Sequence, residues 1–164
     1  MTLWFKVRDF LRPREEILKE VDIEPGFCVL DYGCGPGGYT IPAAQMVGEV
    51  GKVYALDMHP LALRMVQSRA ARKKLTNIDI ILSDCATGLP DRRVDVVLLY
   101  DTFHMLAKPG EVLAELYRIL KPGGILSFND HHMKDENEII FKITGRGLFQ
   151  LSKKGKRVYS FHKI

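Results

Sequence analysis

A glycine-dense segment near the start of the chain restricts its fold more than any other feature. It reads Val29-Leu30-Asp31-Tyr32-Gly33-Cys34-Gly35-Pro36-Gly37-Gly38-Tyr39-Thr40. A short apolar strand, a glycine turn and the start of a helix are how an open α/β sheet presents its first loop to a nucleotide-like ligand. Asp31 narrows the choice of ligand, because a carboxylate there repels a pyrophosphate and suits an ammonium group or hydroxyls.

The rest of the chain alternates between strand and helix patterns. We expect strands at 27–31, 52–57, 77–82, 94–100 and 125–128, and helices at 38–47, 60–75, 111–120 and 136–144. In the helix at 60–75, Leu61, Met65, Val66 and Ala70 are expected to form one apolar side. Lys121-Pro122-Gly123-Gly124 is expected to form a tight turn.

This alternation predicts an α/β fold with a doubly wound, mostly parallel sheet. The segments 148–152 and 157–162 flank a basic, glycine-containing turn and predict an antiparallel hairpin at the C-terminus. A length of 164 residues favours a single domain, with 1–22 as an N-terminal helical segment.

Composition excludes several kinds of partner and compartment. Hydrophobic residues make up 46% of the chain, but no apolar run is long enough to cross a bilayer, so we expect a cytoplasmic protein without a membrane partner. The net charge is only +4, and the basic runs at 69–74 and 153–157 lack interleaved aromatic residues, which disfavours nucleic acid. Three cysteines are an odd number and indicate reduced thiols. Homodimer formation stays open, because a second subunit would complete an open cleft.

The glycine segment resembles the first motif of the class I methyltransferases that depend on S-adenosylmethionine (SAM). The motif reads acidic-x-Gly-x-Gly-x-Gly, which Asp31, Gly33, Gly35 and Gly37 match. The chain is most similar to the group that includes the ubiquinone and menaquinone biosynthesis methyltransferases. An NAD-dependent oxidoreductase stays open as an alternative, because the glycines also fit Gly-x-Gly-x-x-Gly with Asp57 at a suitable distance. The features that favour SAM are Asp31, Ser83-Asp84-Cys85, Leu120-Lys121-Pro122-Gly123-Gly124 and the final hairpin.

The resemblance assigns the methionine part of SAM to the ends of two strands. Gly33, Cys34 and Gly35 form the loop on which the backbone approaches this part, since a side chain at either glycine would block it. Asp31 lies under the loop and holds the amino end of SAM. Tyr100, which ends the fourth strand, lies near the methionine end.

The resemblance assigns the adenosine part to the next two strand ends. Asp57 accepts both ribose hydroxyls, because its two oxygens match two adjacent donors. Met58 lies against the adenine ring. Asp84 accepts a hydrogen bond from the adenine amino group, with the backbone of Cys85 beside it.

The candidate catalytic residues are His104 and Asp101, which follow the fourth strand. Methyl transfer is an in-line displacement in which alignment supplies much of the rate, so a base is needed only if the nucleophile carries a proton. Imidazole exchanges protons near neutral pH, and His104 is our hypothesis for that base. The alternative is a structural histidine that joins the loop to the next helix.

A metal is not expected. Asp101, Asn129 and Asp130 would offer an oxygen-rich cage for Mg²⁺ similar to that of the catechol O-methyltransferases, but the order of Asn and Asp differs. His131 and His132 are instead expected to line or rim the acceptor pocket.

The resemblance implies methyl transfer from SAM to an oxygen, nitrogen or carbon atom of a small-molecule acceptor. A different possibility is a SAM-binding regulatory module without turnover, because the chain shows neither a lid domain nor a definite base. Trp4 and Phe5 are expected either to fold over the cleft or to pack on the sheet edge.

Overall fold

The computed structural model describes residues 14–164, of which 14–19 are helical. Trp4, Phe5 and most of the predicted N-terminal helical segment therefore lie outside the described residues. The helices and strands that follow are β1 (Cys28–Tyr32), α2 (Thr40–Val47), β2 (Lys52–Asp57), α3 (Pro60–Arg72), β3 (Ile78–Leu82), β4 (Val94–Tyr100), the 3₁₀ helix η1 (Phe103–Met105), α4 (Pro109–Ile119), β5 (Leu120–Asn129), α5 (Glu136–Thr144), β6 (Phe149–Lys154) and β7 (Tyr159–Lys163).

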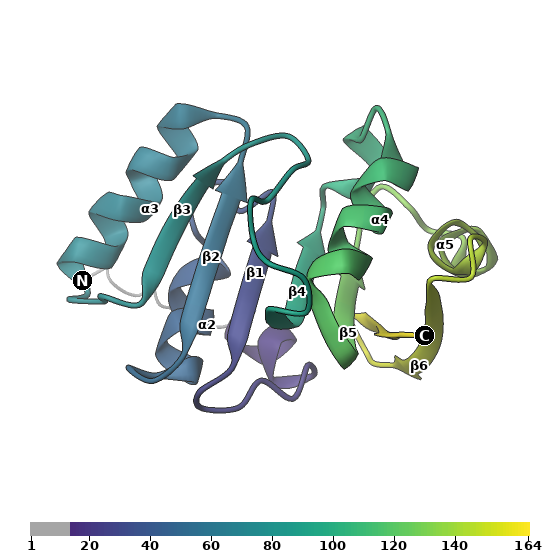
Figure 1. Ribbon diagram of the computed structural model, residues 1–164, viewed down its shortest axis with the longest axis horizontal. Coiled ribbons are helices and arrows are strands. Elements are labelled where there is room, and N and C mark those ends of the chain that lie inside the picture. The colour runs from purple at the N-terminus through teal and green to yellow at the C-terminus, as the bar shows by residue number, and fades with distance from the viewer. Residues whose placement is uncertain (1–13) are drawn as a thin grey trace, which may run out of the picture.

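The strands form one mixed sheet in the order β3-β2-β1-β4-β5-β7-β6 (Figure 1). The first five strands of the chain pair in parallel, and β7 runs antiparallel to both β5 and β6. The predicted α/β fold and its C-terminal antiparallel hairpin are thus confirmed. Buried apolar residues extend along β1 and β4, as expected of central strands that are covered on both faces.

Helices cover both faces of the sheet. On one face, α2 and the helix at 14–19 pack on Val29 and Val53. On the same face, α3 packs on Ala55. On the opposite face, α4 and α5 pack on Leu30 and Leu99. Because β1 to β4 run in parallel, their carboxyl ends meet at one edge of the sheet, where ligands of open α/β sheets bind.

Residues 121–124, where a tight turn is predicted, lie within the bounds of β5 but outside its regular pairing with β4, because Leu120 pairs with Val94 and Ile125 with Val96. Gly123 has a φ of +73°, and a Cβ on Gly124 would lie 2.8 Å from the carbonyl oxygen of Lys121, as expected where the chain turns. A register shift absorbs the extra residues before regular pairing resumes at Ile125.

The apolar face of α3 differs from the prediction. Its buried residues are Leu63, Val66 and Ala70, which share one face at helical spacing. Leu61 and Met65 are 67% and 41% exposed, so they lie outside that stripe.

Candidate functional site

A cleft of about 350 Å³ opens at the carboxyl ends of β1, β2, β3 and β4. It is lined by all of the predicted cofactor residues except one: Asp31, Gly33, Cys34, Gly35, Asp57, Met58, Asp84 and Tyr100. Cys85 is the exception, and its side chain packs against the apolar core. The residues predicted from the sequence to bind the cofactor therefore line one cleft, with the exception of Cys85.

The glycine loop is held by backbone hydrogen bonds to β2. The amides of Gly33 and Cys34 donate to the carbonyl of Leu56, at 2.8 and 2.9 Å. Gly33 and Gly35 have φ of +71° and +52°, which favours glycine at both positions. A Cβ on Gly33 would meet Thr102 Oγ1 at 2.4 Å, whereas a Cβ on Gly35 would enter open space.

Asp31 is a buried carboxyl group below this loop, only 2% exposed. Burial raises its pKa to about 6 and the charge of Asp57 adds to the rise, while the hydrogen bond from Thr40 and the charge of Arg14 oppose it. Thr40 Oγ1 donates to Asp31 Oδ2 over 2.6 Å. A cationic group in the cleft would stabilise the ionised form, so the position suits an ammonium group.

Asp57 ends β2 with both carboxylate oxygens already engaged. Oδ2 accepts from the amide of Gly35 and Oδ1 from the amide of His59, each at 2.9 Å. A carboxylate oxygen can accept more than one hydrogen bond, so both remain able to bind hydroxyl groups. Met58 beside it is 60% exposed.

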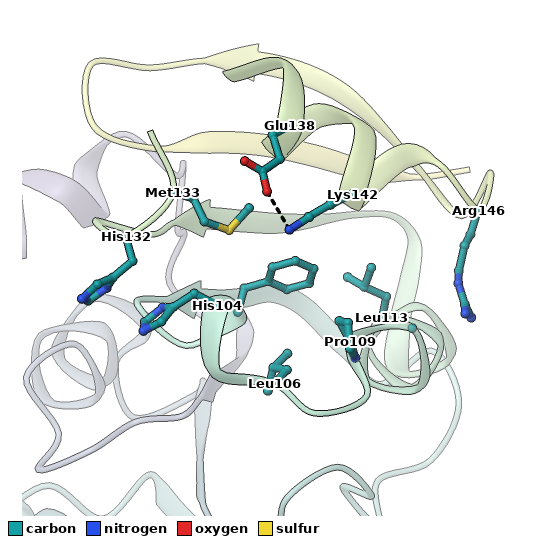
Figure 2. A pocket seen from close by; sticks show the side chains of 11 residues that line it. His104, Leu106, Pro109, Leu113, His132, Met133, Glu138, Lys142 and Arg146 are labelled. Carbon is teal, nitrogen blue, oxygen red and sulfur yellow. Dashed lines mark ion pairs between the residues drawn. The ribbon is translucent and has the colours of Figure 1, made fainter. Parts of the chain in front are cut away.

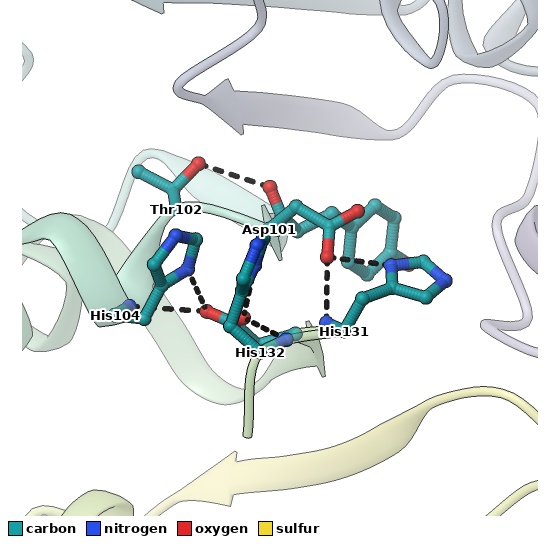
Figure 3. A network of polar contacts seen from close by, with 7 residues as sticks. Asp101, Thr102, His104, His131 and His132 are labelled. Carbon is teal, nitrogen blue, oxygen red and sulfur yellow. Dashed lines mark hydrogen bonds and ion pairs between the residues drawn. The ribbon is translucent and has the colours of Figure 1, made fainter. Parts of the chain in front are cut away.

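The end of β4 places two different polar groups at the cleft. The phenol of Tyr100 is buried and shares a 2.6 Å hydrogen bond with Ser127 Oγ, and burial raises its pKa well above the usual range. Asp101 has a φ of +51°, an uncommon conformation for a residue other than glycine. Its Oδ1 accepts from the amide and Nδ1 of His131, at 2.7 and 2.6 Å, and its side chain remains 39% exposed (Figure 3).

His104 belongs to a separate cluster around Asp130 (Figure 3). Asp130 Oδ2 accepts from the amide and Nδ1 of His104, at 3.0 and 2.9 Å, and Oδ1 accepts from the amide of His132 at 3.0 Å. Burial raises the pKa of Asp130, but these hydrogen bonds outweigh it and hold the pKa below its ordinary value. The rings of His104 and His132 lie against one another, with centroids 3.9 Å apart and planes tilted by 30°.

This cluster faces a second cavity of about 470 Å³ between η1, α4 and α5 (Figure 2). His104 and His132 line it, and His104 does not line the cofactor cleft. Leu106 lines both spaces, so the two adjoin. His131, in contrast, lies on a different cavity beside Asn129.

The two carboxylates considered for a Mg²⁺ cage each have a histidine partner, since Asp101 bonds to His131 and Asp130 bonds to His104. Sequence reasoning also missed Asp130 as the partner of His104. The adjacency of β4 and β5 was the available signal, since it brings residues after these strands together.

The fold and the cleft define a class I SAM-dependent methyltransferase. The family described as "Methyltransferase domain" matches residues 23–162, and the chain belongs to it. SAM is accordingly the methyl donor. Within residues 14–164 no helix has the length and apolar character needed to cross a membrane.

Relatives and solved structures agree with this assignment. The chain is 31% identical over 118 residues to a demethylmenaquinone methyltransferase of Geobacillus sp. (strain WCH70), covering 71% of this chain and 50% of the relative. A trans-aconitate 2-methyltransferase of Methylobacterium radiotolerans is 32% identical over 116 residues, covering 71% and 42%. A SAM-dependent methyltransferase from Aquifex aeolicus superposes with a TM-score of 0.81 at 29% identity, covering 92% and 88%. The chain spans about half the length of the curated relatives it matches.

Proposed function

We propose that the protein transfers the methyl group of SAM to an oxygen, nitrogen or carbon atom of a small-molecule acceptor. The observation that carries this proposal is the second cavity, which adjoins the cofactor cleft at Leu106. Its volume of about 470 Å³ is of the size that a small organic molecule occupies. The names of the relatives support the same class, since demethylmenaquinone and trans-aconitate are both small molecules.

In this proposal each cleft residue contacts a different part of SAM. Asp31 faces the ammonium group, and the open space before Gly35 admits the methionine chain. The oxygens of Asp57 accept the ribose hydroxyls. Met58 and Asp84 line the cleft beyond Asp57, where the adenine ring would lie.

Asp101 is the better placed of the two candidate catalytic residues. Its partly exposed carboxylate lines the cofactor cleft, whereas His104 lines the cavity next to it. We assign Asp101 to accept the proton of an acceptor that carries one. His104 then belongs to the wall of the acceptor cavity.

The test is a screen for methylated products by mass spectrometry, with SAM and a panel of small acids, phenols, quinols and amines. Once an acceptor is found, Asp101→Asn should lower kcat by about 10²-fold or more, the usual contribution of a general base. Binding of SAM, measured by calorimetry, should change little in that variant. SAM binding without methylation of any acceptor would favour a silent SAM-binding module instead.

His104→Ala is the matched comparison, because it removes the other candidate base. It should raise KM for the acceptor more than it lowers kcat. A loss of kcat in His104→Ala that exceeds the loss in Asp101→Asn would overturn the assignment of the base.

A further inference from the structure

We infer that His104, Asp130 and His132 form a binding site for one divalent first-row transition metal ion, with Zn²⁺ the foremost candidate. Two adjacent strands bring these residues together. His104 lies in η1, which follows β4, and the other two residues follow β5 directly. Because β4 and β5 pair in parallel, both segments emerge at the same edge of the sheet.

The spacing of the donor atoms suits one ion. The donor atoms of the three side chains lie within 4.8 Å of one another. Asp130 Oδ2 is 2.9 Å from Nδ1 of His104, and Asp130 Oδ1 is 3.6 Å from Nδ1 of His132. Ligands about 2.1 Å from a tetrahedral ion lie about 3.4 Å apart, so small rotations of the two rings would complete the geometry.

The environment of each donor also favours a cation. The Asp130 side chain is fully buried and fixed by the backbone amides of both histidines, which makes it a rigid anionic anchor. The ring of His132 is 66% exposed, and the 3.6 Å between its Nδ1 and Asp130 is too long for a good hydrogen bond. The His132 imidazole therefore lies beside the buried Asp130 carboxylate, but its Nδ1 makes no good hydrogen bond to that carboxylate.

The donor set decides which metals fit. Two imidazoles and one carboxylate are a common ligand set for zinc and for other divalent transition ions, whereas Mg²⁺ and Ca²⁺ prefer sites made of oxygen. Binding requires His104 Nδ1 to exchange its hydrogen bond with Asp130 for a bond to the ion, which releases a proton when that nitrogen carries one. His104 is then a ligand, which agrees with Asp101 as the proton acceptor.

The position of the site gives the ion a consequence for the reaction. Both histidines lie at one end of the second cavity (Figure 2), so an ion held between them would lie at the edge of the space assigned to the acceptor and would offer a remaining coordination position there. A carboxylate or phenolate oxygen of an acceptor would suit that position. This step rests on the proposed function, whereas the metal site itself does not.

The test uses untagged protein that has been treated with EDTA and then freed of it. Addition of Co²⁺ should produce the visible absorption of a low-coordinate cobalt site and saturate at one equivalent per chain. Calorimetry with Zn²⁺ should give the same stoichiometry. His132→Ala and His104→Ala should each weaken Zn²⁺ binding by about 100-fold, because loss of a ligand should cost at least as much as loss of a residue that supports one.

The matched control is His131→Ala, which removes the neighbouring exposed histidine that bonds to Asp101. It should leave the cobalt spectrum and the affinity for Zn²⁺ unchanged. Circular dichroism checks the fold of each variant, and the exposed His132 ring makes His132→Ala the safer of the two ligand variants. Absence of a cobalt band, or equal binding in wild type and His132→Ala, would overturn the site. Neither readout depends on SAM or an acceptor, so failure of the proposed function would not affect the result.

Discussion

Two glycines of one loop are required for different reasons. A Cβ on Gly33 would meet Thr102 Oγ1 at 2.4 Å and Cγ2 at 2.8 Å, in addition to the cost of a left-handed residue. Gly33→Ala should therefore lower the free energy of unfolding by roughly 3 kcal/mol, measured by urea denaturation. Gly35→Ala, whose Cβ enters open space, should cost roughly 1 kcal/mol but weaken SAM binding. Thr102→Ala should restore part of the stability of Gly33→Ala, and the clash is refuted if it restores none.

The buried carboxyl group of Asp31 makes stability depend on pH. Its pKa is about 6 in the folded protein against 3.8 ordinarily, so ionising it in the fold costs about 3 kcal/mol. The folded state holds this proton where the unfolded state has lost it, so the contribution to stability falls as pH rises from about 4 to about 6. Asp31→Asn should abolish this fall and raise the free energy of unfolding at pH 7.5 by up to about 3 kcal/mol.

The same substitution should weaken SAM binding by about tenfold or more, because the ammonium group loses a charged partner. Denaturation across pH 4–8 and calorimetry with SAM check the two effects. Thr40→Val provides the comparison, since it removes the hydrogen bond to Asp31 but leaves the carboxylate. A variant Asp31→Asn that is no more stable at pH 7.5 would contradict this account of the site.

At the scale of elements, Glu115 of α4 anchors the loop that leads from β3 into β4. Its carboxylate accepts from Arg118 Nε at 2.9 Å and from the amide and Oγ1 of Thr87, at 3.0 and 2.7 Å. The hydrogen bond from Arg118 lowers the pKa of Glu115 to about 2, burial opposes this, and the bonds from Thr87 reinforce it. The stabilisation is therefore complete above about pH 4.5 and is lost as pH falls toward 2.

Glu115→Gln should lower the free energy of unfolding by about 2 kcal/mol at pH 7. The difference from wild type should narrow as the pH is lowered from 5 to 3, measured by urea denaturation. Glu111→Gln in the same helix is the control, because Glu111 is 64% exposed and its pairing with Lys108 contributes little. A deficit for Glu115→Gln that does not depend on pH would show that the carboxylate charge is not what stabilises this loop.

The elements themselves were predicted well where hydrophobic period and burial agree. β4 and the C-terminal hairpin follow from an almost continuous apolar run and from two strands around a basic turn. The turn chemistry of residues 121–124 was read correctly, but it could not show that β5 already begins at Leu120, because that depends on pairing with Val94. Leu61 and Met65 failed because apolar character alone does not fix which side of a helix packs.

The residues of the site were likewise predicted only in part. The sequence predicted the residues at the strand ends, because a parallel sheet brings those ends together whatever the side chains do. It did not predict that η1 turns His104 away from the cofactor cleft and toward Asp130. That arrangement depends on side-chain direction in a short irregular segment, which no period in the sequence encodes.

At the scale of the whole molecule, the cleft is lined by loops that follow four of the parallel strands, while η1, α4 and α5 line the second cavity. The cofactor cleft depends on a few fixed groups, such as the backbone of Gly33 and the carboxylate of Asp57. The acceptor side is built from side chains of α4, α5 and η1. We therefore expect the sequence to constrain the methyl donor strongly and the acceptor only weakly.

Binding of SAM across these loops should stabilise the whole fold. A ligand at about 100 times its dissociation constant adds about 2.7 kcal/mol, which in a domain of this size raises Tm by roughly 5–10 °C. S-adenosylhomocysteine, which keeps the amino acid and ribose groups, should give a similar shift, and NAD should give none. Differential scanning fluorimetry at pH 7.5 measures all three, and Asp57→Ala should lose the shift because the ribose acceptor is gone. A shift with NAD that equals the shift with SAM would contradict the assignment of Asp31, since a pyrophosphate beside that buried carboxylate would be repelled.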